Sequence, residues 1–116
     1  MGIAKQRGEA GEALAAAYLE LIGCRVLARN IRLAGVEVDL VVEEGRCHVV
    51  VEVKTRNRSD YGGAAQAVDR VKQARLERAV RALALEGAPS IRIDVVAVEL
   101  EPDGAMLRHY RNAVTA

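Results

Sequence analysis

The spacing of hydrophobic residues changes along the chain, and these changes predict its first four elements. Residues 4–22 are spaced as in a helix, and a glycine follows as a stop signal. A short strand is expected at 24–29, followed by a loop through NIRLAG. Residues 36–42 alternate strictly between the two faces of a strand, and the turn EEGR leads into a third strand at 47–55. Because the connections are short, these three strands should form an antiparallel meander.

The second half of the chain predicts a helix and two further strands. The stretch RSDYGG is a breaker, and a long helix is expected at 65–86. A β-branched strand at 90–100 and a last strand at 105–114 then follow, separated by the turn EPDG. The order αβββαββ predicts an α/β fold, with a central mixed sheet flanked by helices. A length of 116 residues suits a single domain over 1–116 that can bury its own core.

Strict alternation also assigns side chains to the two faces of the strands. In the second strand one face is expected to carry Val36, Val38, Leu40 and Val42, and the other Glu37, Asp39 and Val41. In the third strand, VVVEVKTR places Glu52 and Lys54 on one face of an otherwise apolar segment. In the first helix, Glu12 shares a face with core-type residues. Several acids are therefore expected to meet near an apolar interior.

Carboxylates that meet near an apolar interior repel one another and lose hydration, so they need a cation. Lys54 supplies only one charge, and carboxylate oxygens favour a hard divalent ion such as Mg²⁺ or Mn²⁺. We expect Asp39 and Glu52 to hold this ion. Such a metal would activate a water for phosphodiester hydrolysis, and Lys54 would steady the developing negative charge.

Simpler interpretations of the same residues stay open. Glu52 and Lys54 could be an ordinary solvent-facing pair on a half-buried sheet. Glu37 could lie farther from the metal, or form an ion pair with Arg32. Glu12 is either a ligand of a second metal or an acid that pairs with a basic neighbour, Lys54 or Arg7. His48 is interpreted as a surface or cross-strand residue rather than a general base.

The charge distribution indicates a polyanionic partner more clearly than the net charge of +1 does. Residues 52–81 contain eight basic and four acidic residues, a local excess of +4. A solvated, arginine-rich helix face would explain the same excess. The three Tyr are the only aromatic residues, which argues against a single-strand binder that stacks bases on aromatic rings. The basic residues expected to contact a nucleic acid are Arg56, Arg58, Lys72 and Arg75, although Lys72 and Arg75 could instead be structural residues that snorkel to the helix edge.

The remaining composition indicates a cytoplasmic protein. The N-terminus is charged where a secretory leader would be apolar, and no apolar run approaches the length of a membrane span. The two cysteines, Cys24 and Cys47, are therefore expected to be free thiols in a reducing compartment. Cysteine and histidine spacing argues against a zinc site, because only Cys47 and His48 are close in sequence and a strand would direct them to opposite sides.

These motifs resemble the YraN family, also called UPF0102, across nearly the whole chain. The resemblance lies in Gly11-Glu12 in the first helix, in Glu37-Val38-Asp39-Leu40 in the second strand, and in Val51-Glu52-Val53-Lys54 followed by Arg56. The family's usual glycine before the first acid of the second strand is Val36 here.

The resemblance implies a restriction endonuclease-like fold, similar to that of archaeal Holliday junction resolvases. It would make Asp39, Glu52 and Lys54 the catalytic core and Glu12 the auxiliary acid. The expected function is therefore a Mg²⁺-dependent nuclease acting on DNA, with branched or structured DNA among the candidate substrates and pairing of two copies left open. The alternatives are a nucleic-acid-binding module of the same fold without turnover, and a structural or partner-binding domain.

Overall fold

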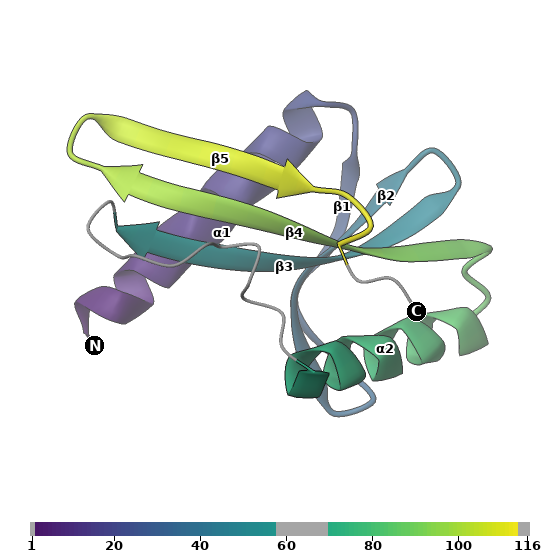
Figure 1. The fold of residues 1–116 in the computed structure, drawn as a ribbon. Coiled ribbons are helices and arrows are strands. Elements are labelled where there is room, and N and C mark those ends of the chain that lie inside the picture. Colours follow the sequence, from purple (N-terminus) through teal and green to yellow (C-terminus); the bar gives the residue numbers. More distant parts are fainter. Residues whose placement is uncertain (1, 58–69, 114–116) are drawn as a thin grey trace.

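The computed structural model describes residues 2–57 and 70–113, and the predicted order of elements is confirmed there (Figure 1). The predicted beginning of the second helix, at 65–69, lies outside the described residues. None of the helices in the described part of the chain is long and apolar enough to cross a membrane. The elements are α1 (Ile3–Leu21), β1 (Arg25–Leu33), β2 (Val36–Glu44), β3 (Cys47–Asn57), α2 (Arg70–Leu85), β4 (Ser90–Glu101) and β5 (Gly104–Tyr110).

The five strands form one mixed sheet in the order β1-β2-β3-β4-β5. The first three strands pair as the predicted antiparallel meander, and β4 and β5 form an antiparallel hairpin. Only β3 and β4 are parallel, with Val51 opposite Asp94. A parallel pair needs a long crossover connection, and α2 lies within that connection. The α/β class and the central mixed sheet flanked by helices are therefore confirmed.

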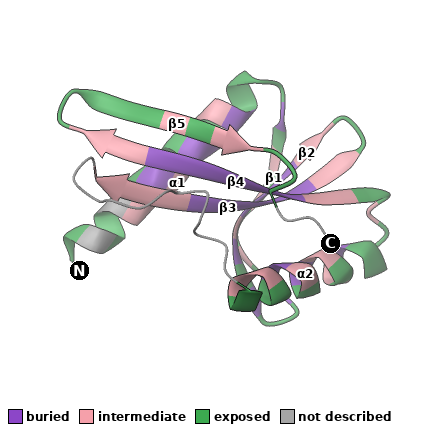
Figure 2. Cartoon of the chain, viewed as in Figure 1, coloured by how far each residue is buried: buried purple, intermediate pink, exposed green. Residues whose placement is uncertain are grey.

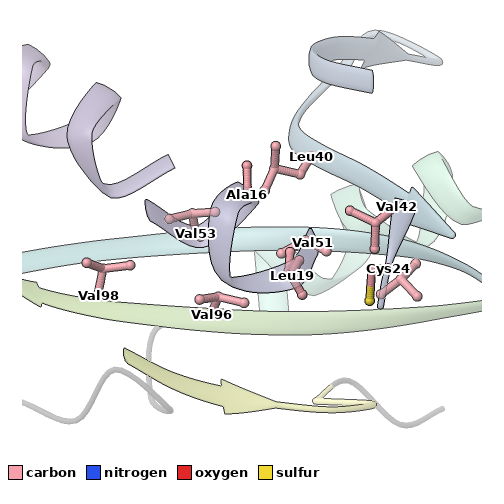
Figure 3. Close-up of a cluster of buried hydrophobic side chains, with 11 residues drawn as sticks. Ala16, Leu19, Cys24, Leu40, Val42, Val51, Val53, Val96 and Val98 are labelled. Carbon is pink, nitrogen blue, oxygen red and sulfur yellow. The ribbon is translucent and has the colours of Figure 1, made fainter. Parts of the chain in front are cut away.

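The two helices cover opposite faces of this sheet. Figure 1 shows α1 behind β3, β4 and β5, and Figure 3 shows Ala16 and Leu19 of α1 against Val51, Val96 and other aliphatic side chains of the strands. On the other face α2 packs through Leu76, Ala79 and Leu83. Buried positions concentrate in the middle of β3 and β4, between the helices (Figure 2). The core is almost entirely aliphatic, as a chain with no Phe or Trp requires.

The first strand is longer than the sequence analysis predicts. The loop expected after residue 29 is instead paired, and β1 continues to Leu33 opposite Val36. Ala34 and Gly35 make the turn, with φ of 52° and 77°. Two consecutive positive φ values are typical of a tight hairpin turn of type I′, which follows the twist of the strands. The glycine that this turn needs is Gly35, so Val36 is free to enter the strand.

The predicted alternation of β2 is wrong in its first half. Val36 and Val38 pack on the α2 side of the sheet, whereas Leu40 and Val42 pack on the α1 side. Pairing between β2 and β3 begins only at Leu40, so the earlier part of β2 diverges from β3. Asn30 of β1, at the same level as Asp39, has a positive φ of 49°, a conformation that Asn tolerates better than most residues. The bend at this level therefore changes which face the valines occupy.

The last strand also ends earlier than predicted, at Tyr110. Asn112 has a φ of 51°, outside the range of a strand, and its backbone N–H turns toward the carboxylate of Asp94. A side chain of β4 therefore accepts the hydrogen bond after β5 has left the ladder.

The helix α1 sits very close to β3 at one point. A Cβ added to Gly11 would lie 1.8 Å from Oγ1 of Thr55, so only glycine fits there, whereas Gly8 has no neighbouring atom within 4 Å. The opposite side of α1 is open, with Leu14 38% and Leu21 86% exposed. This helix is therefore buried on one face only, because the sheet covers just one side of it.

Candidate functional site

Glu52 is a buried acid on the α2 face of the sheet. It is 7% exposed and lies at the middle of β3, where parallel pairing with β4 fixes the backbone. Its Oε1 forms an ion pair with Nζ of Lys72, which reaches it from the first turn of α2 described. An ionised carboxylate at this depth needs such a partner. Lys72 was expected either to contact a nucleic acid or to snorkel to the helix edge, and the structure pairs it with this buried acid.

Asp39 lies where β2 diverges from β3, and its side chain replaces part of the missing ladder. Its Oδ2 accepts a hydrogen bond of 2.8 Å from the backbone N–H of Val53. This bond fixes the carboxylate beside Glu52, one residue away on β3. The bend of β2 therefore brings together two acids that are 13 positions apart in sequence.

The acids disturb one another's ionisation. Burial, followed by repulsion from Glu52, raises the pKa of Asp39 to about 7, against the lowering effect of the Val53 hydrogen bond. Burial also raises the pKa of Glu12, followed by repulsion from neighbours that include Glu37 and Glu52. In addition, Oε1 of Glu12 is buried without a hydrogen-bond partner among the described residues. These effects mark a region with a shortage of positive charge.

Two lysines respond to the same environment in opposite directions. Burial, followed by the neighbouring Lys72, lowers the pKa of Lys54. Burial is the largest single influence on Lys72 and would lower its pKa, but the bond to Glu52, together with the other neighbouring interactions that include attraction to Glu52 and Asp39, raises it. Lys54 is therefore more easily deprotonated than a free lysine, whereas Lys72 is firmly protonated.

An open pocket of about 470 Å³, here called the acidic pocket, lies between α2 and the β1–β2 hairpin. Acids occupy one part of its wall, while Arg32 of β1 and Arg75 and Arg78 of α2 stand at its rim. These three rim arginines form no hydrogen bond or ion pair with the residues that the structure describes. The lining residues are Arg32, Gly35, Val36, Glu37, Asp39, Glu52, Lys72, Arg75, Leu76 and Arg78.

The structure brings together most of the residues predicted for the site. Glu12, Asp39, Glu52, Lys54 and Lys72 all influence one another's charge, and Arg75 lines the acidic pocket. Glu12 and Lys54 lie beside this pocket rather than in its lining.

Other candidates of the sequence analysis lie elsewhere or act differently. Arg56 is farther along β3, opposite Glu99 of β4 and away from the pocket lining. Arg58 lies outside the described residues. Glu37 does line the pocket, but the ion pair with Arg32 that the sequence left open is not formed, although the two residues face each other across the hairpin.

Arg32 and Arg78 were not among the predicted site residues. The signal for Arg32 is the hairpin, because extending β1 to Leu33 places Arg32 next to the acids of β2. Lys72 carried a clearer signal, since a lysine within the apolar arc of a helix must either snorkel or meet a buried acid.

A second buried acid was also missed. Asp94 of β4 is fully buried on the α1 side of the sheet. Its carboxylate accepts hydrogen bonds from Arg92 (2.9 and 3.2 Å), from His109 Nε2 (2.7 Å) and from the backbone N–H of Asn112 (2.8 Å). Tyr18 of α1 completes the group by a 2.9 Å hydrogen bond to Nδ1 of His109. An acid inside the β-branched run IRIDVVAV was the available signal, equivalent to that of Glu52.

The acidic pocket lacks a complete set of metal ligands on its own. Within residues 2–57 and 70–113, no three acidic, histidine or cysteine side chains converge as they would around a bound ion. Mg²⁺, however, is usually held by one or two carboxylates together with waters and substrate phosphates. Asp39, Glu52 and the unpartnered oxygen of Glu12 suit this smaller requirement in their chemistry.

Together, fold and site define a small α/β domain with an acidic pocket beside a bent strand and a lysine two residues after the buried acid. The family model described as "Uncharacterised protein family UPF0102" matches residues 11–98. The chain belongs to this family. It is 45% identical over 107 residues to a UPF0102 protein of Symbiobacterium thermophilum, covering 90% of this chain and 91% of the relative.

Further relatives agree with this assignment. A UPF0102 protein of Geobacter sulfurreducens is 43% identical over 110 residues, covering 91% of this chain and 86% of the relative. The UPF0102 protein YraN of Salmonella arizonae is 47% identical over 72 residues, covering 62% of this chain and 55% of the relative. Among solved structures, SfsA of Pyrococcus furiosus in complex with Ca²⁺ matches with 17% identity and a TM-score of 0.38, over 97% of this chain and 65% of that one.

Proposed function

We propose that the protein is a metal-dependent nuclease that hydrolyses DNA phosphodiester bonds at the acidic pocket. The observation that carries the proposal is the meeting of Asp39, Glu52 and Glu12, with a raised pKa for Asp39 and a buried, unpartnered oxygen on Glu12. Perturbed acids that gather in a pocket are a common property of catalytic sites, because the arrangement is costly for folding. A shortage of positive charge in the free protein is what a cation-binding site requires.

In this proposal Asp39 and Glu52 hold a Mg²⁺ or Mn²⁺ ion, and Glu12 is the auxiliary acid. When bound, the ion would supply Lewis-acid polarisation of the phosphate and an acidified water. The chain's own residues position the substrate. Lys54, two residues after Glu52, would stabilise negative charge on the phosphate, and the Val53 N–H holds the Asp39 carboxylate in place.

The rim arginines would bind the DNA backbone. Arg32, Arg75 and Arg78 lack partners among the described residues and stand around a pocket whose wall is acidic. A guanidinium matches a phosphate by two parallel hydrogen bonds, so phosphates on either side of the scissile bond could rest on this rim. Arg56 and Arg58 remain proposed contacts farther along the strand.

Cleavage assays test this function. The metal-free protein would be incubated with duplex, single-stranded and four-way branched DNA, with Mn²⁺ or EDTA. We expect Mn²⁺-dependent cleavage, lowered at least about a hundredfold in Lys54→Ala, because loss of one electrostatic stabiliser typically costs this much. Arg81→Ala, on the exposed side of α2, is the matched control and should cleave normally. The proposal would be rejected if wild type still cleaved DNA in EDTA and Lys54→Ala cleaved as fast as wild type.

A nucleic-acid-binding module without turnover is the second candidate. The absence of three converging ligands within the described residues favours it, since such a module needs no metal. It predicts salt-dependent DNA binding that is weakened by Arg75→Ala and Arg78→Ala, with no product under any metal condition. Product formation on any of the three DNA substrates would therefore decide against this candidate.

A further inference from the structure

Lys72 is the cation that pairs with the buried acid Glu52. The Nζ of Lys72 contacts Oε1 of Glu52. Glu52 itself is a β3 residue that is only 7% exposed. Lys72 comes from α2, whereas all the acids come from α1 and the strands. The cation that neutralises Glu52 in the free protein therefore belongs to α2, a different element from the acids around it.

Acids outnumber bases in the group of charges around this ion pair. Glu12 is repelled by Glu37 and Glu52, and Asp39 by Glu52 and Glu12. Lys72 acts on Asp39 with the opposite sign, and Lys54 interacts with Glu52, Asp39 and Lys72. Adding a divalent cation would place two more positive charges next to two ammonium groups. Like charges that share one partly buried site repel each other strongly. Lys72 and the metal therefore compete for the same carboxylates.

We infer that Lys72 is an exchangeable counter-ion, which leaves Glu52 when a divalent metal binds and then becomes available to a substrate phosphate at the acidic pocket. This inference rests on the proposed function, because it requires the metal site. Lys72 already lines the pocket together with Arg75 and Arg78 of the same helix, so a released ammonium would join the rim arginines without movement of the strands.

The exchange has a thermodynamic consequence. If metal binding releases a phosphate-binding lysine, the metal raises the affinity for DNA, and DNA raises the affinity for the metal by the same factor. Lys72 is thus a positioning residue that couples the two ligands, since it would contact both the acid and the substrate at different stages. A permanent structural ion pair would give no such coupling.

The test is a calorimetric titration of Mn²⁺ into the metal-free full chain, comparing wild type with Lys72→Met and Lys72→Gln. Loss of the competing charge should tighten Mn²⁺ binding, on the order of tenfold, in both variants. Lys72→Gln keeps a hydrogen-bond donor without charge, so it separates charge from hydrogen bonding. Arg81→Met removes a cation from the exposed side of the same helix and should bind Mn²⁺ as wild type does.

A second measurement follows the melting temperature and the DNA affinity with and without Ca²⁺. Without metal, Lys72→Met should melt below wild type, because Glu52 loses its partner, and metal should restore more of its stability than it adds to wild type. Ca²⁺ should strengthen DNA binding by wild type more than by Lys72→Met.

Different outcomes would overturn the exchange of Lys72 and the proposed metal site. Equal Mn²⁺ affinity in wild type and both Lys72 variants would overturn the exchange while leaving the metal site in place. No Mn²⁺ binding by any variant, in protein that melts cooperatively, would overturn the metal site itself and the exchange with it.

Discussion

The two buried acids among the described residues lie on opposite faces of the sheet and have different surroundings. Asp94, on the α1 side, is fully buried and receives hydrogen bonds from Arg92, His109 and Asn112. Glu52, on the α2 side, has the Lys72 ammonium as its ion-pair partner and further acids close by. Both are carboxylates at the middle of valine-rich strands, so sequence composition alone does not distinguish them.

The difference lies in how completely each site satisfies its own charges. Around Asp94 the oxygens already have donors, and Glu44 extends the group outward through Arg92 and Arg111. Around Glu52, Asp39 has a raised pKa and one oxygen of Glu12 has no partner. A hydrogen-bonded network whose charges are satisfied stabilises the native state, whereas a cluster of acids with a raised pKa costs stability. The free energy of unfolding of single variants can test this contrast.

The largest effect is expected at Asp94. Replacing it by Ala leaves the buried imidazole of His109 and the backbone N–H of Asn112 without their acceptor, while Arg92 keeps only its bond to Glu44. This should lower the free energy of unfolding by about 3–5 kcal/mol. Urea unfolding at pH 7 measures this loss. A loss under about 1 kcal/mol would show that the network around Asp94 is not what holds α1 and β5 to the sheet.

Gly11→Ala should have the next largest effect, because its Cβ would overlap Thr55. We expect a loss of about 1–3 kcal/mol from overpacking, together with displacement of Glu12 from the acids. Gly8→Ala is the matched control on the same helix, where a Cβ meets no atom within 4 Å. The control should be neutral, or stabilising by up to about 1 kcal/mol through helix propensity. Equal effects of the two variants would contradict the close approach of α1 to β3.

Asp39→Asn should stabilise the metal-free protein, the opposite of the effect at Asp94. The folded-state pKa of Asp39, about 7, lies above its ordinary value of 3.8. Wild type therefore loses stability as pH rises from about 4 to about 7, while the variant does not. Its amide oxygen can still accept the Val53 N–H.

Urea unfolding in EDTA measures this effect. At pH 8 the variant should exceed wild type by about 1–2 kcal/mol, and the gain should shrink toward pH 4. Metal should then stabilise wild type only. A variant less stable than wild type at pH 8 would mean that the Asp39 carboxylate is satisfied, as that of Asp94 is.

The smallest effect is expected at Glu44, at the outer end of the Asp94 network. Hydrogen bonds from Arg111 and Arg92 lower its pKa to about 2, below the ordinary value of 4.5. Its contribution is therefore present above about pH 4.5 and is lost as the pH falls through 2. Because Glu44 and Arg111 are partly exposed, Glu44→Gln should cost only about 0.5–1 kcal/mol at pH 7, and less at pH 3. A pH-independent cost would indicate packing rather than charge.

Much of the fold could be predicted from periodicity because it depends on local patterns. The alternation of β3 placed Val49, Val51 and Val53 on one face and Glu52 and Lys54 on the other, and the structure agrees for the buried valines. Alternation failed in β2, where Val38 and Leu40 occupy different faces. The bend in β2 follows from the point where β2 and β3 stop pairing and from the conformation of Asn30. Neither is visible in the residue pattern of β2 itself.

The sequence by itself determined the order of elements and the α/β class, and it singled out Glu12, Asp39 and Glu52, because hydrophobic spacing and turn residues act over a few positions. Only the tertiary structure decided that Lys72 neutralises Glu52, that the Val53 N–H holds Asp39, and that Asp94 is satisfied by His109 and Asn112. Each of these depends on two elements meeting across the sheet or along its edges. Whether a buried charge is balanced is set by what packs against it, so residue type alone leaves it open.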